Sequence, residues 1–298
     1  MSKIKTLNVK RCVAVFMAVL ITVLSLSYTD NSHTDATNTR RQYYVYNAKT
    51  GVKIYEYYLD PVEVYNNSRT VVDTDDRNPD KQKNGVVKII THFANYYNNS
   101  GFVVGDHVIA TAAHCVCGDR VSKILLFNEN GEVVSEATPV EYHVPAHYAQ
   151  SGTTDKDYDY ALITVKEDLH DYAKFELGVP LDSFLDGNAD VTVTGFPDTV
   201  KHEEVNDTEN KHMIYSGVGQ IYGGSELLIY YTADASHGNS GGPVYITESF
   251  NDISGNGNNK TYYTVLGINT NSGNNCNIGI RMTTDLIHFY KNNPYLLW

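Results

Sequence analysis

An all-β fold, built as barrels or as a sandwich, is what the sequence predicts. Short runs of Val, Ile, Tyr and Phe recur along the chain and are bounded by Gly, Asn and Asp, as is typical of strands joined by turns. Many of the 24 Tyr lie in these runs. Long amphipathic patterns of helical spacing are nearly absent, which disfavours a mainly helical protein.

The predicted strands follow one another from Val86 onward. Turns at 105–106 and 128–131 each separate two apolar runs and predict hairpins. Residues 283–285, Thr-Thr-Asp, precede an apolar stretch and predict a capped C-terminal helix. Strands are predicted over 86–93, 101–104, 107–111, 124–127, 133–134, 160–165, 191–194, 213–215, 227–231, 244–247 and 262–268.

Residues 1–27 are predicted to be a secretory signal peptide. Basic residues precede the apolar run Cys12–Leu26, and Ser25 and Ser27 suit a cleavage site after residue 27. The run is shorter than the roughly 20 residues that span a bilayer, although a retained anchor is the alternative. We therefore expect an exported, extracellular protein.

The exported chain is expected to divide into a pro-segment over 28–69 and a folded domain over 70–298. The pro-segment is polar and irregular, with one or two short strands around 43–46 and 52–59. Three cysteines remain after the leader, which allows at most one internal disulfide and leaves a free thiol. The cysteines are Cys115, Cys117 and Cys276.

The formal net charge limits the partners. It is −12 over 298 residues, which disfavours nucleic acid or an anionic membrane surface as the main partner. We expect no nucleic acid, no stable membrane association, and neither a cofactor nor a metal.

Ser240 is the predicted nucleophile. It lies in the stretch S-H-G-N-S-G-G-P, residues 236–243, which follows the apolar run Leu227–Tyr231. Gly238 has no Cβ, so its N–H can turn toward an oxygen that becomes negative during acyl transfer. The N–H groups of Gly238 and Ser240 are therefore the predicted oxyanion hole. A glycine-rich hairpin turn is the alternative.

His114 and Asp159 are predicted to activate this serine. A serine hydroxyl needs a base to remove its proton, and His114 ends a predicted strand on small residues, where its ring can face a cleft. Asp159 precedes another apolar strand and can orient the imidazole. Taken singly, a packed histidine and a strand cap are the simpler interpretations. The order along the chain is His114, Asp159 and Ser240.

Three motifs around these residues carry a resemblance. T-A-A-H-C, D-Y-A-L-I and G-N-S-G-G-P-V resemble the catalytic motifs of chymotrypsin-fold serine proteases. Segments 71–77, 193–197, 267–273 and 277–283 are similar to the bacterial glutamyl-endopeptidase, or V8-like, branch. Over residues 70–290 the resemblance implies two six-stranded antiparallel β-barrels packed face to face, with the active site between them.

The resemblance also implies a secreted zymogen, cleaved near Arg69/Thr70. Asn239 stands before the serine where the animal digestive enzymes carry an aspartate. The ion pair between that aspartate and a new N-terminal amine is therefore unavailable here. Removal of the pro-segment must act in another way.

The substrate pocket is expected to include Asp234, Ala235, His237, Asn269 and Thr270. The V8-like branch prefers an acidic P1 residue, the one before the cleaved bond, and the resemblance attributes this partly to a histidine and a threonine. Asn269 and Ala235 occupy those positions. His237 could substitute for the histidine, whereas Asp234 could favour a basic P1 residue. Acidic, basic and other P1 preferences stay open.

The function predicted from the sequence is that of a secreted, monomeric serine endopeptidase acting on protein or peptide substrates through an acyl-enzyme. The alternative is an inactive, protease-like binding or adhesion protein. All three catalytic residue types are present, which favours the enzyme.

Overall fold

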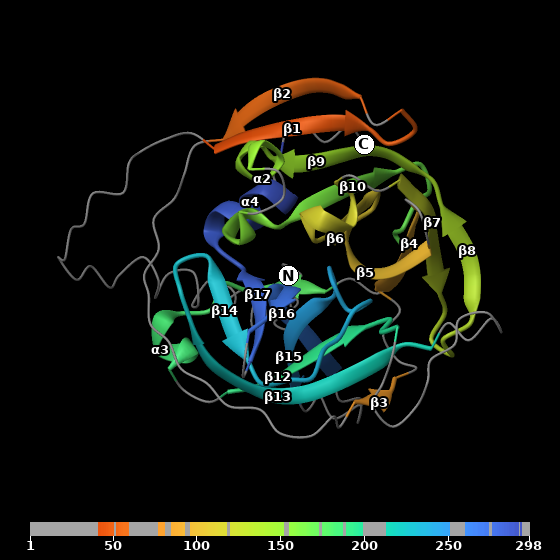
Figure 1. Cartoon of the computed structure of the whole chain (residues 1–298). Coiled ribbons are helices and arrows are strands. Elements are labelled where there is room, and N and C mark those ends of the chain that lie inside the picture. The colour runs from red at the N-terminus through yellow and green to blue at the C-terminus, as the bar shows by residue number, and fades with distance from the viewer. Residues whose placement is uncertain are drawn as a thin grey trace, which may run out of the picture. The chain divides into compact units, whose positions relative to one another are not determined.

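Two sheets, antiparallel except for the short parallel pairing of β11 with β16, make up most of the described chain (Figure 1). The computed structural model describes residues 41–50, 52–59, 77–80, 85–92, 96–117, 120–151, 155–172, 175–186, 189–198, 213–250, 260–273, 276–291 and 293. They belong to one compact unit that begins at Asn38. The expected signal peptide and the expected cleavage near Arg69/Thr70 lie outside the described residues.

The first sheet has nine strands in the order β2-β1-β9-β10-β6-β5-β4-β7-β8. Its central strands β6 and β10 are rich in β-branched residues and are wholly buried. In contrast, four of the five residues of β8 are exposed. The strands are β1 (Arg41–Asn47), β2 (Lys53–Leu59), β4 (Val86–His92), β5 (Tyr96–Gly105), β6 (Val108–Thr111), β7 (Arg120–Phe127), β8 (Val133–Ala137), β9 (Pro139–Pro145) and β10 (Ala161–Val165).

The second sheet contains a closed six-stranded barrel. Its path β16-β15-β12-β13-β14-β17 returns to the start because β17 also pairs with β16. Two short strands, β3 (Asn78–Pro79) and β11 (Glu176–Leu177), pair with β13 and β16. The barrel strands are β12 (Asp190–Gly195), β13 (Tyr215–Gly224), β14 (Leu228–Tyr231), β15 (Pro243–Phe250), β16 (Lys260–Ser272) and β17 (Asn277–Arg281).

The helices are short. At the start of α4, the N–H of Leu286 donates to Thr283 Oγ1 at 3.1 Å, which caps the helix as the sequence predicts. No helix in the described ranges is long and apolar enough to cross a membrane. The helices are η1 (Ala113–Cys115), α2 (Ala146–Gln150), η2 (Lys156–Tyr158), α3 (Asp182–Leu185) and α4 (Thr284–Lys291).

Aromatic rings join the two sheets. Phe127 from β7 stacks on Phe196, which follows β12, with ring centroids 4.8 Å apart. Phe175 contacts Phe102 of β5 on one side and Tyr245 of β15 on the other. Burying one such side chain stabilises the fold by roughly 1.5–3 kcal/mol. This apolar interface holds the sheets together and leaves polar groups at its margin for a site.

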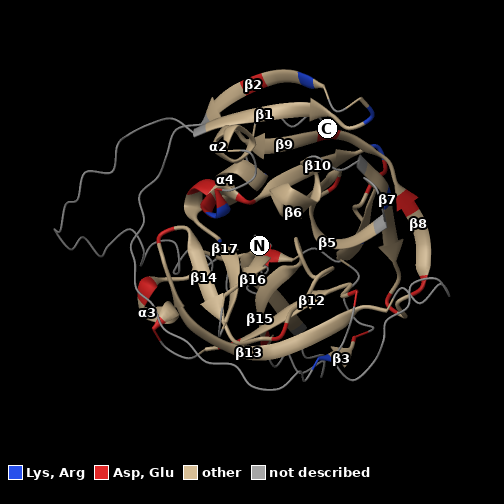
Figure 2. Cartoon of the chain, viewed as in Figure 1, with Lys and Arg blue, Asp and Glu red and all other residues tan. Residues whose placement is uncertain are grey.

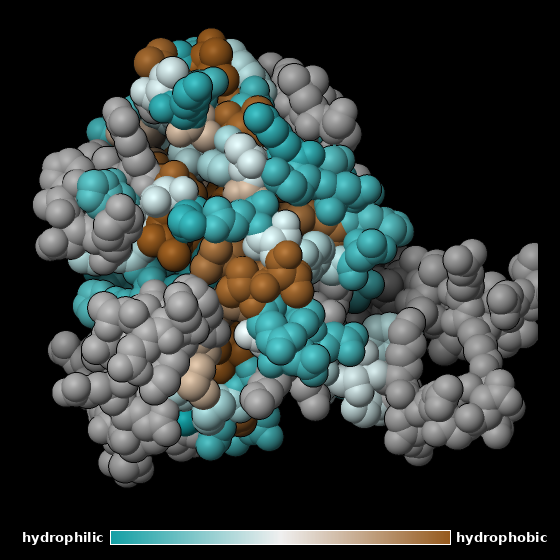
Figure 3. Space-filling view, turned by 90° about the vertical axis from the view of Figure 1, so that its right-hand side faces the viewer, coloured by the Kyte–Doolittle hydropathy of each residue, from teal (hydrophilic) through white to brown (hydrophobic). Residues whose placement is uncertain are grey.

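The surface carries the charge. Figure 2 shows the described Asp and Glu residues mainly in loops, helices and outer strands such as β8. Figure 3, the view from the right-hand side of Figure 1, shows hydrophobic patches set among hydrophilic groups. Exposed apolar residues of the described chain include Val133 and Val134 of β8.

The predicted all-β class with a C-terminal helix is confirmed. The first sheet has nine strands, two of which, β1 and β2, come from the expected pro-segment. β1 pairs with β9, from Tyr43 against Pro145 to Asn47 against Glu141. Strand β9 was not among the predicted strands, because the prolines at its two ends are typical of turns.

Candidate active site

His114 and Asp159 lie together because their strands are neighbours. β10 pairs with β6, with Ala161 opposite Thr111. His114 follows β6 in the turn η1, and Asp159 lies two residues before the start of β10. The side chain of His114 is 34% exposed, whereas that of Asp159 is 7% exposed. The imidazole therefore reaches solvent while its partner is buried.

Asp159 holds His114 with both carboxylate oxygens. The backbone N–H of His114 donates to Oδ1 at 2.9 Å, and the ring nitrogen Nδ1 lies 2.7 Å from Oδ2. Because an ionised carboxylate only accepts hydrogen bonds, the proton is assigned to Nδ1. In the neutral ring, Nε2 is then left with a lone pair that can accept a proton.

The pKa of His114 is raised well above its usual value. Burial by itself lowers this pKa, but the neighbouring Cys115 and the carboxylate of Asp159 outweigh that effect. The carboxylate stabilises the imidazolium, so His114 is a stronger base than an isolated histidine.

Ser240 lies in a tight turn that only glycine permits on both sides. Gly238 and Gly241 have φ of 92° and 83°, in the left-handed region. A Cβ on Gly238 would lie 2.2 Å from the carbonyl oxygen of Phe196, and one on Gly241 would lie 2.1 Å from Thr111 Oγ1. The turn thus packs directly against both sheets.

Two backbone N–H groups are available beside Ser240. The carbonyl of His237 accepts a hydrogen bond from the N–H of Asp198 at 2.8 Å. In a trans peptide the C=O and the next N–H point in opposite directions, so the N–H of Gly238 points away from Asp198. Among the described residues, neither Gly238 nor Ser240 donates its N–H to a protein group. This is the arrangement that an oxyanion hole requires.

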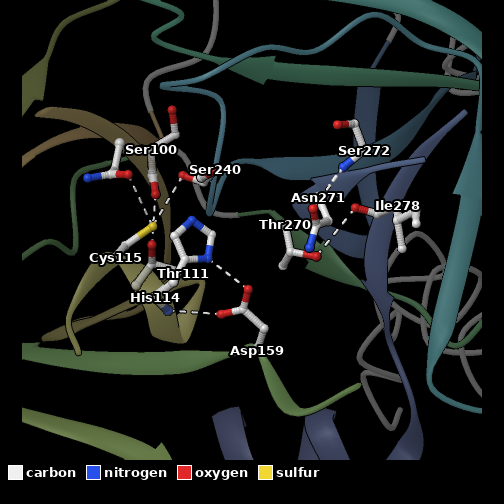
Figure 4. A network of polar contacts seen from close by, with 11 residues as sticks. Ser100, Thr111, His114, Cys115, Asp159, Ser240, Thr270, Asn271, Ser272 and Ile278 are labelled. Atoms are coloured by element: carbon white, nitrogen blue, oxygen red, sulfur yellow. Dashed lines mark hydrogen bonds and ion pairs between the residues drawn. The ribbon is translucent and has the colours of Figure 1, made fainter. Parts of the chain in front are cut away.

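The ring of His114 stands between Asp159 and Ser240 in Figure 4. Cys115, the next residue, places its Sγ 3.6 Å from the carbonyl oxygen of Ser240. Within the described chain, no hydrogen bond joins Ser240 Oγ to the ring. Catalytic hydrogen bonds of this kind commonly tighten when substrate binds.

Ser100 of β5 connects this turn to the first sheet. Its N–H donates to the carbonyl of Ser240 at 2.8 Å, and its hydroxyl donates to the carbonyl of Gly238 at 2.7 Å. The N–H of Phe196 donates to Ser100 Oγ at 2.9 Å. Sequence reasoning missed Ser100, because a serine within a strand has no distinguishing pattern.

Arg77 donates hydrogen bonds to the same turn. Its side chain is buried, and Nη1 donates to Ser236 Oγ at 2.6 Å and to Asn239 Oδ1 at 3.3 Å. Asn239 Oδ1 also accepts from the N–H of Ser236. Asn239 occupies the position of the aspartate in the animal digestive enzymes, so an arginine paired with an amide braces this loop. Sequence reasoning placed Arg77 in a family segment but assigned it no role.

Asn269 of β16 lies next to the serine turn. The N–H of Gly241 donates to the carbonyl of Asn269, whose own N–H donates to the carbonyl of Gly242. Tyr231 donates its hydroxyl to Asn269 Oδ1 at 2.5 Å. Burial, with a smaller contribution from Cys276, raises the pKa of Tyr231 well above its usual value, so the phenol keeps its proton.

The bond from Tyr231 determines which way the amide of Asn269 faces. Because Asn269 Oδ1 accepts the hydrogen bond from Tyr231, Nδ2 does not bond to Tyr231, and no described residue accepts a hydrogen bond from Nδ2. Asn269 is 4% exposed, and its Nδ2 is therefore a neutral N–H donor with no acceptor among the described residues.

The remaining predicted pocket residues lie on either side of the serine turn. Thr270 is largely buried and donates to the carbonyl of Ile278 at 3.4 Å (Figure 4). Asp234 and Ala235 are partly exposed, and His237 is exposed. The predicted pocket residues thus come from β16 and from the loop before Ser240.

All three cysteines in the described chain are free thiols. Cys115 is buried, and its Sγ contacts Asn99 Oδ1 at 3.5 Å. The described residues contain no cluster of three or more His, Cys, Asp or Glu that could hold a metal ion.

Comparison with known proteins agrees with this geometry. The model of a family described as trypsin-like peptidase domain matches residues 99–249. The solved structure of a Glu endopeptidase is similar, with 17% identity, a TM-score of 0.56, and coverage of 74% of this chain and 96% of that one. Protease Anisep from Arthrobacter nicotinovorans is 17% identical, with a TM-score of 0.48 and coverage of 72% and 97%. No curated protein matches the chain.

The similarity to the Glu endopeptidase shows a common fold, the chymotrypsin-like double barrel. The family match covers just over half of the 298 residues. The chain therefore belongs to the trypsin-like peptidase domain family and is a serine protease.

Proposed function

We propose that this protein is a secreted endopeptidase in which Ser240, His114 and Asp159 form the catalytic triad. The observation that carries the proposal is the pair of bonds from His114 to Asp159, beside a serine whose neighbouring N–H groups are unpaired within the described chain. The expected export from residues 1–27 agrees with this role.

The reaction proceeds in two halves. Ser240 Oγ attacks the carbonyl carbon of the peptide bond, and His114 Nε2 takes the hydroxyl proton. The N–H groups of Gly238 and Ser240 donate to the oxygen that becomes negative. His114 passes its proton to the leaving amine, and water then repeats the sequence on the acyl-enzyme. Asp159 stabilises the imidazolium in both halves.

We further propose that the P1 side chain accepts a hydrogen bond from Asn269 Nδ2. A carboxylate accepts such a bond more strongly than an amide does, so Glu or Asp is preferred. Because Asn269 is neutral, the preference is smaller than a charged partner would produce, and Gln is also accepted.

Covalent labelling tests the triad. Processed protein treated with a small phosphonate probe should carry one adduct on Ser240, detected by mass spectrometry of its peptides, since the activated hydroxyl reacts as it does with substrate. The Ser240→Ala variant should remain unlabelled. Folded wild-type protein without an adduct would favour the inactive, protease-like binding protein.

Peptide digestion tests the pocket. Cleavage of a mixed peptide library should occur mainly after Glu and Asp, with weaker cleavage after Gln. Replacing Asn269 with His, which can carry a charge, should increase the ratio of Glu to Gln cleavage by about tenfold. Predominant cleavage after Lys or Arg would instead assign the pocket to Asp234.

The pH profile tests the role of Asp159. His114 must be neutral to act as a base, and its pKa is raised, so kcat/KM should rise as the pH increases through a value above the ordinary pKa of histidine. Asp159→Asn removes the carboxylate that raises this pKa, so the rise should move to lower pH. The maximal rate should fall by about four orders of magnitude. An unchanged midpoint in the variant would contradict the assigned pairing.

Kinetics of Arg77 variants test the brace behind the oxyanion loop. Arg77→Ala removes the donor to Ser236 and Asn239, so kcat should fall by about tenfold or more while KM changes little. Arg77→Lys keeps the charge but cannot match the planar fork of donors, so it should give an intermediate kcat. If Arg77→Ala and Arg77→Lys lower the melting temperature equally but leave kcat unchanged, Arg77 supports only the fold.

A further inference from the structure

The hairpin of β1 and β2 lies within the segment expected to be a pro-segment, yet it is built into the folded unit. β1 pairs with β9 over five residue pairs, so the hairpin extends the first sheet. Figure 1 shows it along the outer side of β9. The compact unit starts at Asn38, ahead of the hairpin. The hairpin is therefore part of the same sheet as β6 and β10.

Aromatic packing fills the space between the hairpin and the C-terminal helix. Tyr43, Val45 and Tyr57 are each at most 3% exposed. Tyr43 stacks between Tyr57 and Phe289 of α4, with ring centroids 5.4 and 4.5 Å away. Removing the hairpin would uncover Phe289, which is fully buried.

Buried hydroxyl groups make the contact specific. The hydroxyl oxygens of Tyr43 and Tyr160 lie 3.0 Å apart, and Tyr160 directly follows Asp159. Tyr57 receives a hydrogen bond from Asn293 Nδ2 at 2.7 Å and lies 3.2 Å from His143 Nδ1 of β9. The hairpin therefore contacts Tyr160, the buried residue between Asp159 and the start of β10.

We propose that the hairpin stays bound after maturation, so that the active enzyme consists of two chains. The surface formed by β9, Tyr160 and α4 is the docking site, and the chain's own residues 41–59 are the partner. This inference goes beyond the proposed function and rests on the cleavage near Arg69/Thr70 that the family resemblance implies. Water adds across the bond between them, leaving a carboxylate on Arg69 and an amine on Thr70. The contacts of the hairpin within the described chain involve neither residue.

The test uses the chain from residue 28 with Ser240→Ala, which prevents self-cleavage, and a recognition sequence for a specific protease inserted after Arg69. After the cut, gel filtration in native buffer should give one peak at the elution volume of the uncut protein, containing both fragments. Denaturant should separate them. An N-terminal fragment that elutes alone in native buffer would overturn the inference.

Two tyrosines of the hairpin provide matched variants. Tyr43 is buried, whereas Tyr58 is 47% exposed. Tyr43→Ala should release the cut fragment about tenfold faster than Tyr58→Ala, because the ring of Tyr43 stacks on Phe289 of α4 whereas Tyr58 is exposed. Tyr43→Phe keeps the stack and removes the hydroxyl, and it should give an intermediate rate. Equal release rates for all three variants would contradict the proposed docking surface.

The two proposals fail separately. Phosphonate labelling of wild-type Ser240 does not depend on whether the hairpin stays bound. If Ser240 is labelled but the N-terminal fragment dissociates, only the two-chain proposal is contradicted. If Ser240 is not labelled but both fragments elute in one peak, only the catalytic proposal is contradicted.

Discussion

Ser100 is the residue on which the geometry between the two sheets depends. Its N–H and hydroxyl donate to the carbonyls of Ser240 and Gly238, and its hydroxyl oxygen accepts from the N–H of Phe196. The hydroxyl of Thr111 donates to the carbonyl of Ser100. Each buried polar group that lost such a partner would cost about 1–3 kcal/mol. The apolar interface attracts the sheets without a preferred direction, whereas these bonds specify one register. The proposed nucleophile, which precedes β15 of the second sheet, is thereby held beside the proposed base, which follows β6 of the first.

The same division between packing and direction applies within the site. Pairing of β6 with β10 brings His114 near Asp159, and two hydrogen bonds then orient the ring. Packing against Phe196 requires a glycine at position 238, and the bond from Asp198 then turns the peptide so that one N–H points away from the loop. Neighbouring strands bring the groups close, and short polar contacts determine which atoms face the substrate.

Two segments that precede β4 in the chain support the site from two directions. Arg77 braces the loop before Ser240, and the β1–β2 hairpin packs behind the residue that follows Asp159. Both contacts are present in the uncut chain. The loop is therefore braced without the ion pair to a new N-terminal amine that the animal digestive enzymes use, which accords with Asn239 in place of their aspartate.

The sequence by itself determined the all-β class, the C-terminal helix and the residue types of the proposed chemistry. Reactive groups need special local surroundings, such as the glycines around Ser240 and the small residues before His114, and these remain visible as motifs. Only the tertiary structure decided the roles of Ser100, Arg77 and the hairpin. Ser100 meets Gly238 across 138 residues, and Arg77 meets Ser236 across 159. An ordinary serine or arginine carries no local mark of a partner so distant, because that partner is set by the packing of the whole chain.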